Sequence, residues 1–330
     1  MSLAQVMMML GGAASPPTLS ALNFTVIDTA GGGQRLVFTV DDSSGCISAE
    51  VSGGGPAVTD FQIDDTTHVS GVAPAHAAGA VSWTVTNGGG TSNALSGSKY
   101  WDPSLVTGVD TWLDAERGVT QSGTVSAWLD GSSHARNYVQ ATGALRPAYT
   151  ANAFGSLHGL TFGASHSLRN ATPSALVGMS VFVVAKWTSS DATPSRSDTV
   201  ALAAVGDIVN ATMGFGAAAG NVQSVKLNTG GSPVRSTSTG QSLNNGNPQH
   251  IGAVTASATT KLYSAGSLVA TDSTGGGIWA GTSYDTIGNT YTASDFFDGT
   301  IGEIVVVSGA ISAGDLADLY QHARQRWGVA

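Results

Sequence analysis

The sequence predicts an all-β protein made of a small and a larger β-sandwich, with one helix near its C-terminus. Charged residues form only 11% of the 330 residues, against roughly 25% in an ordinary soluble domain. Glycine is abundant, with 44 copies, and glycine supplies the positive φ angles of tight turns. Short runs such as RLVFTV and VSWTV alternate apolar and polar residues, which is the pattern of half-buried strands.

Composition also excludes several classes of function. The net charge is −9, and the 13 lysines and arginines are scattered, so no basic patch for nucleic acid is expected. The single cysteine, Cys46, leaves no internal disulfide and no cysteine-based zinc site. No apolar stretch approaches 18 residues, so no membrane span is predicted. No metal and no cofactor are predicted either.

Residues 1–18 form a predicted apolar arm that ends at Pro16-Pro17. Methionine is unbranched and adapts to irregular surfaces, so this arm is a candidate for docking onto a partner. The alternative is a cleaved signal peptide, although no lysine or arginine precedes the apolar run. The candidate docking residues are Leu3, Val6, Met7, Met8, Met9 and Leu10.

The first predicted domain covers residues 19–101 and consists of short strands separated by glycine triplets. Its segments PPTLSALN, GGGQRLVFTV, VAPAHAAGAVSWTVTN and GGGTS resemble the IPT/TIG family of immunoglobulin-like domains. Residues 24–30 depart from that pattern, because the usual proline and glycine after the first strand are replaced. The resemblance implies a spacer or assembly module without catalytic residues.

A linker is predicted at residues 102–107, and a second domain at 108–330. MSVFVVAKW and IGEIVVV are apolar at consecutive positions, which is typical of central strands covered on both faces. One helix is predicted after Ser312, an N-cap candidate with Asp315 three residues later, and Gly328 closes it. Its expected packing stripe consists of Leu316, Leu319, Tyr320, Ala323 and Trp327.

This second domain resembles the concanavalin A-like, laminin-G-type jelly-roll domains of phage and bacterial surface proteins. The segments that carry the resemblance are TWLDAERGV, VSAWLDGSSHARNYVQA, LHGLTF and DGTIGEIVVVSGAISAGDLADLYQHARQRWGV. Members of this fold often bind sugars, some through Ca²⁺, and here Asp130, Asn137 and Asp298 could supply oxygens. Because LTFGASHSL has no acidic residue after Phe-Gly, solvated turn residues are the preferred interpretation.

Other members of that fold are glycoside hydrolases, which need two carboxylates facing each other across the sugar. The only glutamates are Glu50, Glu116 and Glu303, and no strand carries alternating Glu and Asp. The seven histidines show no metal-binding spacing either. No catalytic residue is therefore predicted, and the chain is expected not to be an enzyme. Candidate contacts for a ligand or partner are the loop aromatics Trp279, Tyr284 and Tyr291.

Two functions are compatible with these observations. The first is a virion structural protein of a tailed bacteriophage, such as a capsid decoration, head-fibre or tail-associated subunit. It would form homo-oligomers, with a trimer ranked first, and contact capsid or tail proteins at the virion surface. The alternative is a bacterial surface or secreted carbohydrate-binding protein, with the jelly roll as the lectin and cell-surface glycan as the partner.

Overall fold

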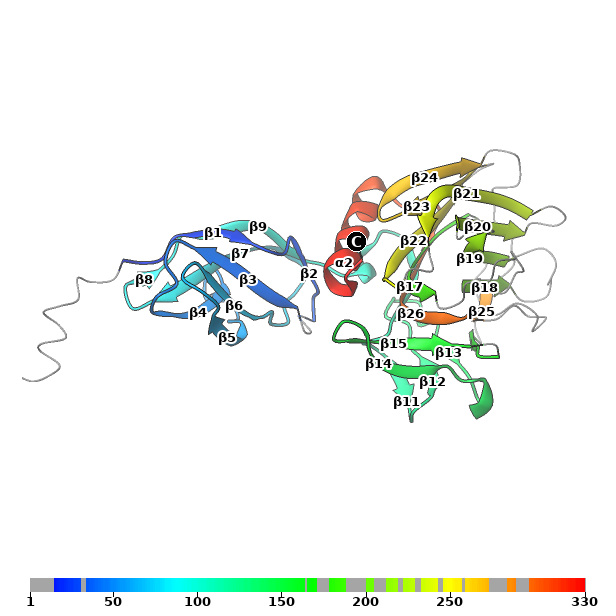
Figure 1. Cartoon of the computed structure of the whole chain (residues 1–330), viewed down its shortest axis with the longest axis horizontal. Helices are drawn as coiled ribbons and strands as arrows, with labels where there is room; N and C mark the ends of the chain where they lie inside the picture. Colours follow the sequence, from blue (N-terminus) through cyan, green and yellow to red (C-terminus); the bar gives the residue numbers. More distant parts are fainter. Residues whose placement is uncertain are drawn as a thin grey trace, which may run out of the picture. The chain divides into compact units, whose positions relative to one another are not determined.

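The structure is a computed structural model. It describes residues 15–30, 34–163, 165–170, 178–187, 200–204, 212–218, 222–228, 233–242, 246–256, 259–272, 284–288 and 297–329. The chain divides into two compact units, Met1–Asp102 and Pro103–Ala330. Nearly all described elements are strands, with one α-helix close to the C-terminus (Figure 1). The predicted all-β class with a C-terminal helix is therefore confirmed.

The first unit contains two β-sheets. One has the strand order β1-β3-β6-β5, and the other the order β2-β9-β7-β4 with β8 beside β7. The strands are β1 (Leu19–Leu22), β2 (Val26–Ile27), β3 (Arg35–Val40), β4 (Cys46–Val51), β5 (Thr59–Ile63), β6 (His68–Val72), β7 (Gly79–Asn87), β8 (Gly90–Thr91) and β9 (Leu95–Tyr100).

Both sheets of the first unit share one hydrophobic core. β3 buries every second residue, including Leu36 and Phe38, as its alternating sequence predicts. Phe38 packs against Trp83 of the facing sheet, with ring centroids 5.5 Å apart. Trp83 also donates a hydrogen bond to Ser98 Oγ at 3.0 Å, so its polar atom is satisfied within the core. This unit is a β-sandwich.

The second unit begins with the 3-10 helix η1 (Pro103–Leu105) and contains two larger sheets. The described strands of the first are β10 (Val109–Asp114), β14 (Ala148–Phe154), β15 (Leu157–Phe162), β17 (Met179–Trp187), β22 (Gln249–Ala256), β23 (Thr259–Ser264), β24 (Ser267–Asp272) and β26 (Gly299–Ser308). Those of the second are β11 (Val119–Gln121), β12 (Val125–Trp128), β13 (Tyr138–Val139), β16 (Leu168–Asn170), β18 (Val200–Ala204), β19 (Thr212–Ala218), β20 (Val222–Asn228), β21 (Pro233–Ser242) and β25 (Tyr284–Ile287). A second 3-10 helix, η2 (Gly143–Leu145), lies between β13 and β14.

These two sheets pack on one another through a common core, which joins Val183 and Ile304 of the first sheet to Trp128 and Leu168 of the second. The predicted central strands are confirmed. β17 lies between β26 and β22 and buries all but one of its residues. β26 pairs with β17 on one side and with β10 and β15 on the other. The unit is thus a two-sheet β-sandwich of jelly-roll type built around these strands.

The helix α2 (Ala313–Trp327) begins and ends where the sequence predicts. Ser312 Oγ accepts a hydrogen bond from the Asp315 amide at 3.0 Å, and Gly328 closes the helix with φ 68°. Leu319, Ala323 and Trp327 are buried, as expected from their spacing. No helix in the described part of the chain is long and apolar enough to cross a membrane.

Candidate functional site

Two carboxylates face each other on neighbouring strands of the jelly roll. Asp114 ends β10 and lies directly opposite Glu303 of β26 in the antiparallel register. The sequence pattern of single strands does not reveal this pair, because the two residues are far apart in sequence and meet only through strand pairing. Both side chains are buried, with 2% of the Asp114 residue and 2% of the Glu303 residue exposed.

The helix α2 supplies two basic side chains that hold this pair. Arg326 donates a hydrogen bond to Asp114 Oδ2 at 2.9 Å. His322 Nε2 lies 3.1 Å from Glu303 Oε1, and Trp112 Nε1 donates to the same oxygen at 2.9 Å. His322 and Arg326 are four residues apart and therefore share one helix face, so the cluster anchors α2 to the sheet.

The electrostatics of the cluster follow from its burial. Burial raises the pKa of Asp114 above its ordinary value, against the opposing charge of Arg326. Burial also acts to raise the pKa of Glu303, but His322, the hydrogen bond from Trp112 and Arg326 outweigh it and hold that pKa below its ordinary value. His250 lies buried nearby and stacks on Phe182 at 5.6 Å; burial lowers its pKa to about 4.

Neither carboxylate of this pair is placed for glycoside hydrolysis, which needs a carboxylic acid and a second carboxylate flanking an accessible glycosidic bond. Here the two carboxyl groups are closed off from solvent and engaged by a guanidinium, an imidazole and an indole N–H. Their arrangement stabilises the fold rather than presenting an acid and a nucleophile to a substrate.

The three residues whose oxygens could bind calcium, Asp130, Asn137 and Asp298, are only partly brought together. Asp130 accepts hydrogen bonds from the amides of Trp112, Ser132 and Arg136, each at 2.8 Å. Asn137 Oδ1 accepts from the Asp130 amide at 2.9 Å, while Asp298 is exposed beside β26. The oxygens of Asp130 therefore organise the loop between β12 and β13. Among the described residues, no group of three His, Cys, Asp or Glu side chains could hold a metal ion.

The side chains of the predicted contact aromatics and of the predicted arm lie outside the described residues. The prediction that Tyr284 lies in a loop is wrong: Tyr284 is the first residue of β25, between β16 and β18, and its backbone pairs with Ala204. Its side chain, together with Trp279 and Tyr291, lies outside the described residues. The same holds for the arm residues Leu3, Val6, Met7, Met8, Met9 and Leu10. All of these assignments stay predictions.

A partly exposed polar cluster lies where the turn after β10 meets the start of β15. Glu116 Oε1 accepts hydrogen bonds from the backbone amide of His158 and from its ring Nδ1, which lies 2.9 Å away. The His158 ring stacks on Tyr149 at 4.6 Å with the planes 5° apart. The Tyr149 hydroxyl donates to the Ala115 carbonyl at 3.1 Å. The side chains of His158 and Glu116 are 36% and 24% exposed.

This Glu116–His158–Tyr149 cluster combines a flat ring pair with a carboxylate and an imidazole at the surface. Burial raises the pKa of Tyr149, and the nearby Glu116 and Asp114 add to the increase, so this phenol stays neutral. Such a surface offers apolar contact beside hydrogen-bonding groups. Sequence reasoning did not select it, although Glu116 and His158 lie in the TWLDAERGV and LHGLTF segments that carry the family resemblance.

The fold and these sites define an all-β protein with a jelly-roll unit whose two facing carboxylates are buried. Residues 162–317 match the family model described as the concanavalin A-like lectin/glucanases superfamily, of laminin G type. The matched residues lie within the second unit. No curated protein sequence matches the chain.

Several solved structures resemble the chain at low identity. A Trypanosoma rangeli sialidase in complex with sialic acid is 11% identical, with 92% of this chain and 52% of that chain covered and a TM-score of 0.47. The ligand-binding domain of botulinum neurotoxin serotype D in complex with N-acetylneuraminic acid is 12% identical, with 69% and 55% covered and a TM-score of 0.46. The binding domain of Paraclostridial mosquitocidal protein 1 is 10% identical, with 66% and 52% covered and a TM-score of 0.43. The chain spans about half the length of each of these structures.

Proposed function

We propose that this chain is a non-enzymatic carbohydrate-binding protein of a bacterial surface or of a secreted type, with the jelly-roll unit as the lectin. The observation that carries this proposal is the match of residues 162–317 to the concanavalin A-like lectin/glucanases model. Fold alone does not set function, so the choice between lectin and glucanase rests on the carboxylates.

The buried Asp114–Glu303 pair supports the lectin over the glucanase. The described strands bring these two carboxylates face to face, and α2 contacts them through Arg326 and His322. Glu116, the glutamate that is partly exposed in the jelly roll, pairs with His158 rather than with a second carboxylate. A hydrolase mechanism would need an accessible acid beside a nucleophile or base.

We place the sugar contact at one of two candidate surfaces. The Glu116–His158–Tyr149 cluster offers a carboxylate acceptor and a stacked ring pair, which suit the hydroxyls and the C–H face of a sugar ring. The second candidate is the set of aromatic residues predicted from sequence, Trp279, Tyr284 and Tyr291.

A glycan array with the full-length chain tests the proposal, followed by titration calorimetry of each glycan that binds, with and without EDTA. If the Glu116–His158–Tyr149 cluster binds the sugar, glycan affinity should fall at least tenfold in Glu116→Gln and in His158→Ala. If the predicted aromatics bind it, the same loss should appear in Trp279→Ala and in Tyr284→Ala. Val139→Ala is the matched control, because Val139 is an exposed side chain of β13 that belongs to neither candidate surface. Absence of any bound glycan contradicts the lectin, and release of reducing sugar from oligosaccharides contradicts its non-enzymatic character.

Assembly as a tailed-phage virion subunit, with capsid or tail partners and a homo-oligomer, stays a prediction from sequence resemblance. The family match supports the lectin more directly, since its description names lectins and glucanases. The two functions are separated by deleting residues 1–15. Loss of incorporation into purified particles would support assembly, whereas unchanged glycan binding by the same deletion variant would support the lectin.

A further inference from the structure

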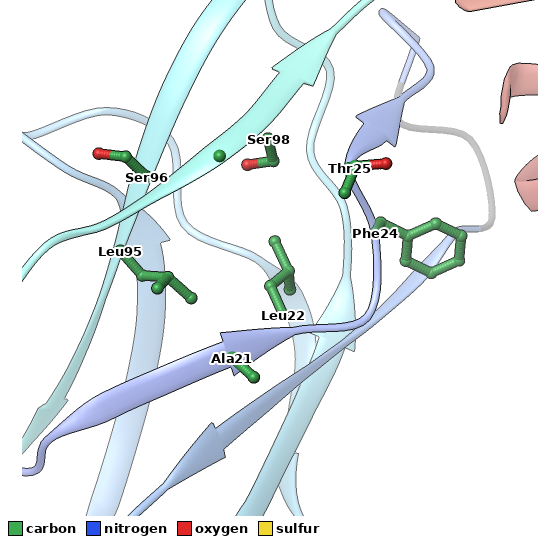
Figure 2. A pocket seen from close by; sticks show the side chains of 8 residues that line it. Ala21, Leu22, Phe24, Thr25, Leu95, Ser96 and Ser98 are labelled. Carbon is green, nitrogen blue, oxygen red and sulfur yellow. The ribbon is translucent and has the colours of Figure 1, made fainter. Parts of the chain in front are cut away.

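The first unit contains a hollow of about 280 Å³ between β1 and β9. Figure 2 shows the side chains of Leu22 and Leu95 between the two strands, with Phe24 just beyond the end of β1. These three residues are partly buried against the core of the sandwich. Ser96, Ser98 and Thr25 add hydroxyl groups to the lining. The hollow is therefore an opening onto apolar surface.

The two strands are joined at both ends of this hollow and separate between them. At one end, Asn93 Oδ1 accepts from the Leu19 amide and Asn93 Nδ2 donates to the Leu19 carbonyl, both at 2.9 Å. At the other end, the Lys99 amide donates to the Thr25 carbonyl at 2.9 Å. Within the described strands, β1 pairs only with β3. β2 pairs with β9 at Lys99 and Tyr100, which are the last two residues of β9.

The chain enters this unit beside the end that Asn93 closes. Asn87 Nδ2 donates to the Ser15 carbonyl at 2.9 Å, and a Cβ on Gly90 would lie 3.2 Å from Pro16. The position of Ser15 is thus fixed close to the start of β1. An extended chain spans about 3.3–3.6 Å per residue, so seven residues reach about 24 Å. That reach covers the whole length of β1 and brings Met8 to the hollow.

We propose that the apolar segment Leu3–Leu10 of the same chain docks into this hollow and fills it with the side chains of Met7, Met8 or both. Gly11-Gly12 lies between the segment and Ser15, and glycine has no side chain that would obstruct an extended path along β1. Methionine fills irregular apolar spaces. The volume exceeds the about 150 Å³ that holds a benzene molecule, so one or two such side chains fit.

Hydrogen–deuterium exchange of the full-length chain tests the docking. We expect residues 3–10 to exchange at least tenfold more slowly than an unstructured peptide of the same sequence. Ala21 is exposed and lines the hollow, so Ala21→Trp should occupy it and remove that protection. Ala78→Trp, at an exposed position of the same unit outside the hollow, should leave the protection unchanged. Exchange within β3 and β7 reports that each variant is folded.

Disulfide trapping identifies the chain that supplies the segment. In a Cys46→Ala background, Met8→Cys with Ala21→Cys should form an intramolecular disulfide at the mass of the monomer. Disulfide-linked dimers would overturn docking within one chain. Unprotected exchange of residues 3–10, or protection that survives Ala21→Trp, would overturn docking in the hollow altogether.

Discussion

At the scale of single residues, Arg326 is the buried cation beside Asp114, and the partly exposed Arg117 places its Nε 3.4 Å from the same carboxylate oxygen. Its guanidinium lies 2.9 Å from Asp114 Oδ2, and the side chains are 3% and 2% exposed. Without Arg326, Asp114 keeps only the longer ion pair with Arg117 among its described ion pairs, and losing the close partner of a buried pair costs more than the pair itself contributes. The stability of the jelly roll should therefore depend strongly on this one side chain.

We predict that Arg326→Met lowers the free energy of unfolding by about 3 kcal/mol, measured by urea denaturation at pH 7. Adding Asp114→Asn should restore part of the loss, because the neutral amide removes the stranded charge. Arg324→Met is the matched control: Arg324 is an exposed arginine of the same helix, and its replacement should stay within about 0.5 kcal/mol. Equal losses for the two arginines would contradict the role of the buried pair.

His250 predicts how the jelly roll responds to acid. Burial lowers the pKa of this imidazole to about 4 in the folded chain, against roughly 6.5 when unfolded. Between these values the unfolded state binds the proton and the folded state does not, so stability falls as the pH decreases from 6.5 towards 4. The shift corresponds to about 3 kcal/mol at roughly 1.4 kcal/mol per unit.

Urea denaturation of His250→Gln at pH 7.0 and pH 4.5 tests this dependence. The variant should lose less stability on acidification than the wild type, because its buried side chain has no proton to gain. His134→Gln is the control, since His134 is exposed and should leave the acid loss unchanged. A pH dependence identical in the wild type and His250→Gln would show that other groups of the cluster carry the effect.

The apolar residues on the buried face of α2 could be predicted from the sequence, and the polar residues on that face could not. The 3.6-residue period places Leu319, Ala323 and Trp327 on the packing face of α2, and all three are buried. His322 and Arg326 lie on the same face, but they would normally be assigned to solvent. Their burial depends on Asp114 and Glu303, which only the strand register brings beneath the helix.

At the scale of elements, the bulge in β26 accommodates α2. The register between β17 and β26 shifts at Gly302, between Ile301 and Glu303. A Cβ on Gly302 would lie 2.9 Å from the Trp327 ring and 3.2 Å from Phe154. The glycine therefore gives the closing helix room to place its final tryptophan against the sheet.

We predict that Gly302→Ala destabilises the jelly roll by about 1–3 kcal/mol, the usual cost of overpacking a core. Thermal or urea unfolding of the full chain measures the change. Gly143→Ala is the matched control, since a Cβ at Gly143 meets nothing within 4 Å. A neutral Gly302→Ala would mean that Trp327 moves freely, and the helix would then be only loosely packed.

Element identity was easier to predict than element pairing. Alternation identified the strand Arg35–Val40, and consecutive apolar residues identified Met179–Trp187 as central. Pairing joins segments far apart in the chain, such as β10 with β26, and no local pattern encodes that register. For the same reason, the facing carboxylates and the Glu116–His158 contact could not be predicted.

At the scale of the whole molecule, each unit has a hydrophobic core of its own. One cluster joins the facing sheets of the first unit around Phe38 and Trp83, and the other joins those of the second unit around Trp128 and Ile304. No residue in the described part of the chain belongs to both clusters. Units with separate cores can fold independently.

We therefore predict that a fragment of residues 103–330 folds alone and keeps the glycan affinity of the full chain within about twofold. Its size of 228 residues lies within the range of single domains. The buried cluster of Asp114, Glu303, His322 and Arg326 also lies wholly inside it. Circular dichroism and tryptophan fluorescence during urea unfolding should show one cooperative transition. A fragment that aggregates would contradict independent folding and would mean that the jelly roll needs the first unit in order to fold. A folded fragment that lacks glycan binding would instead place the sugar contact on the first unit or on a surface that it completes.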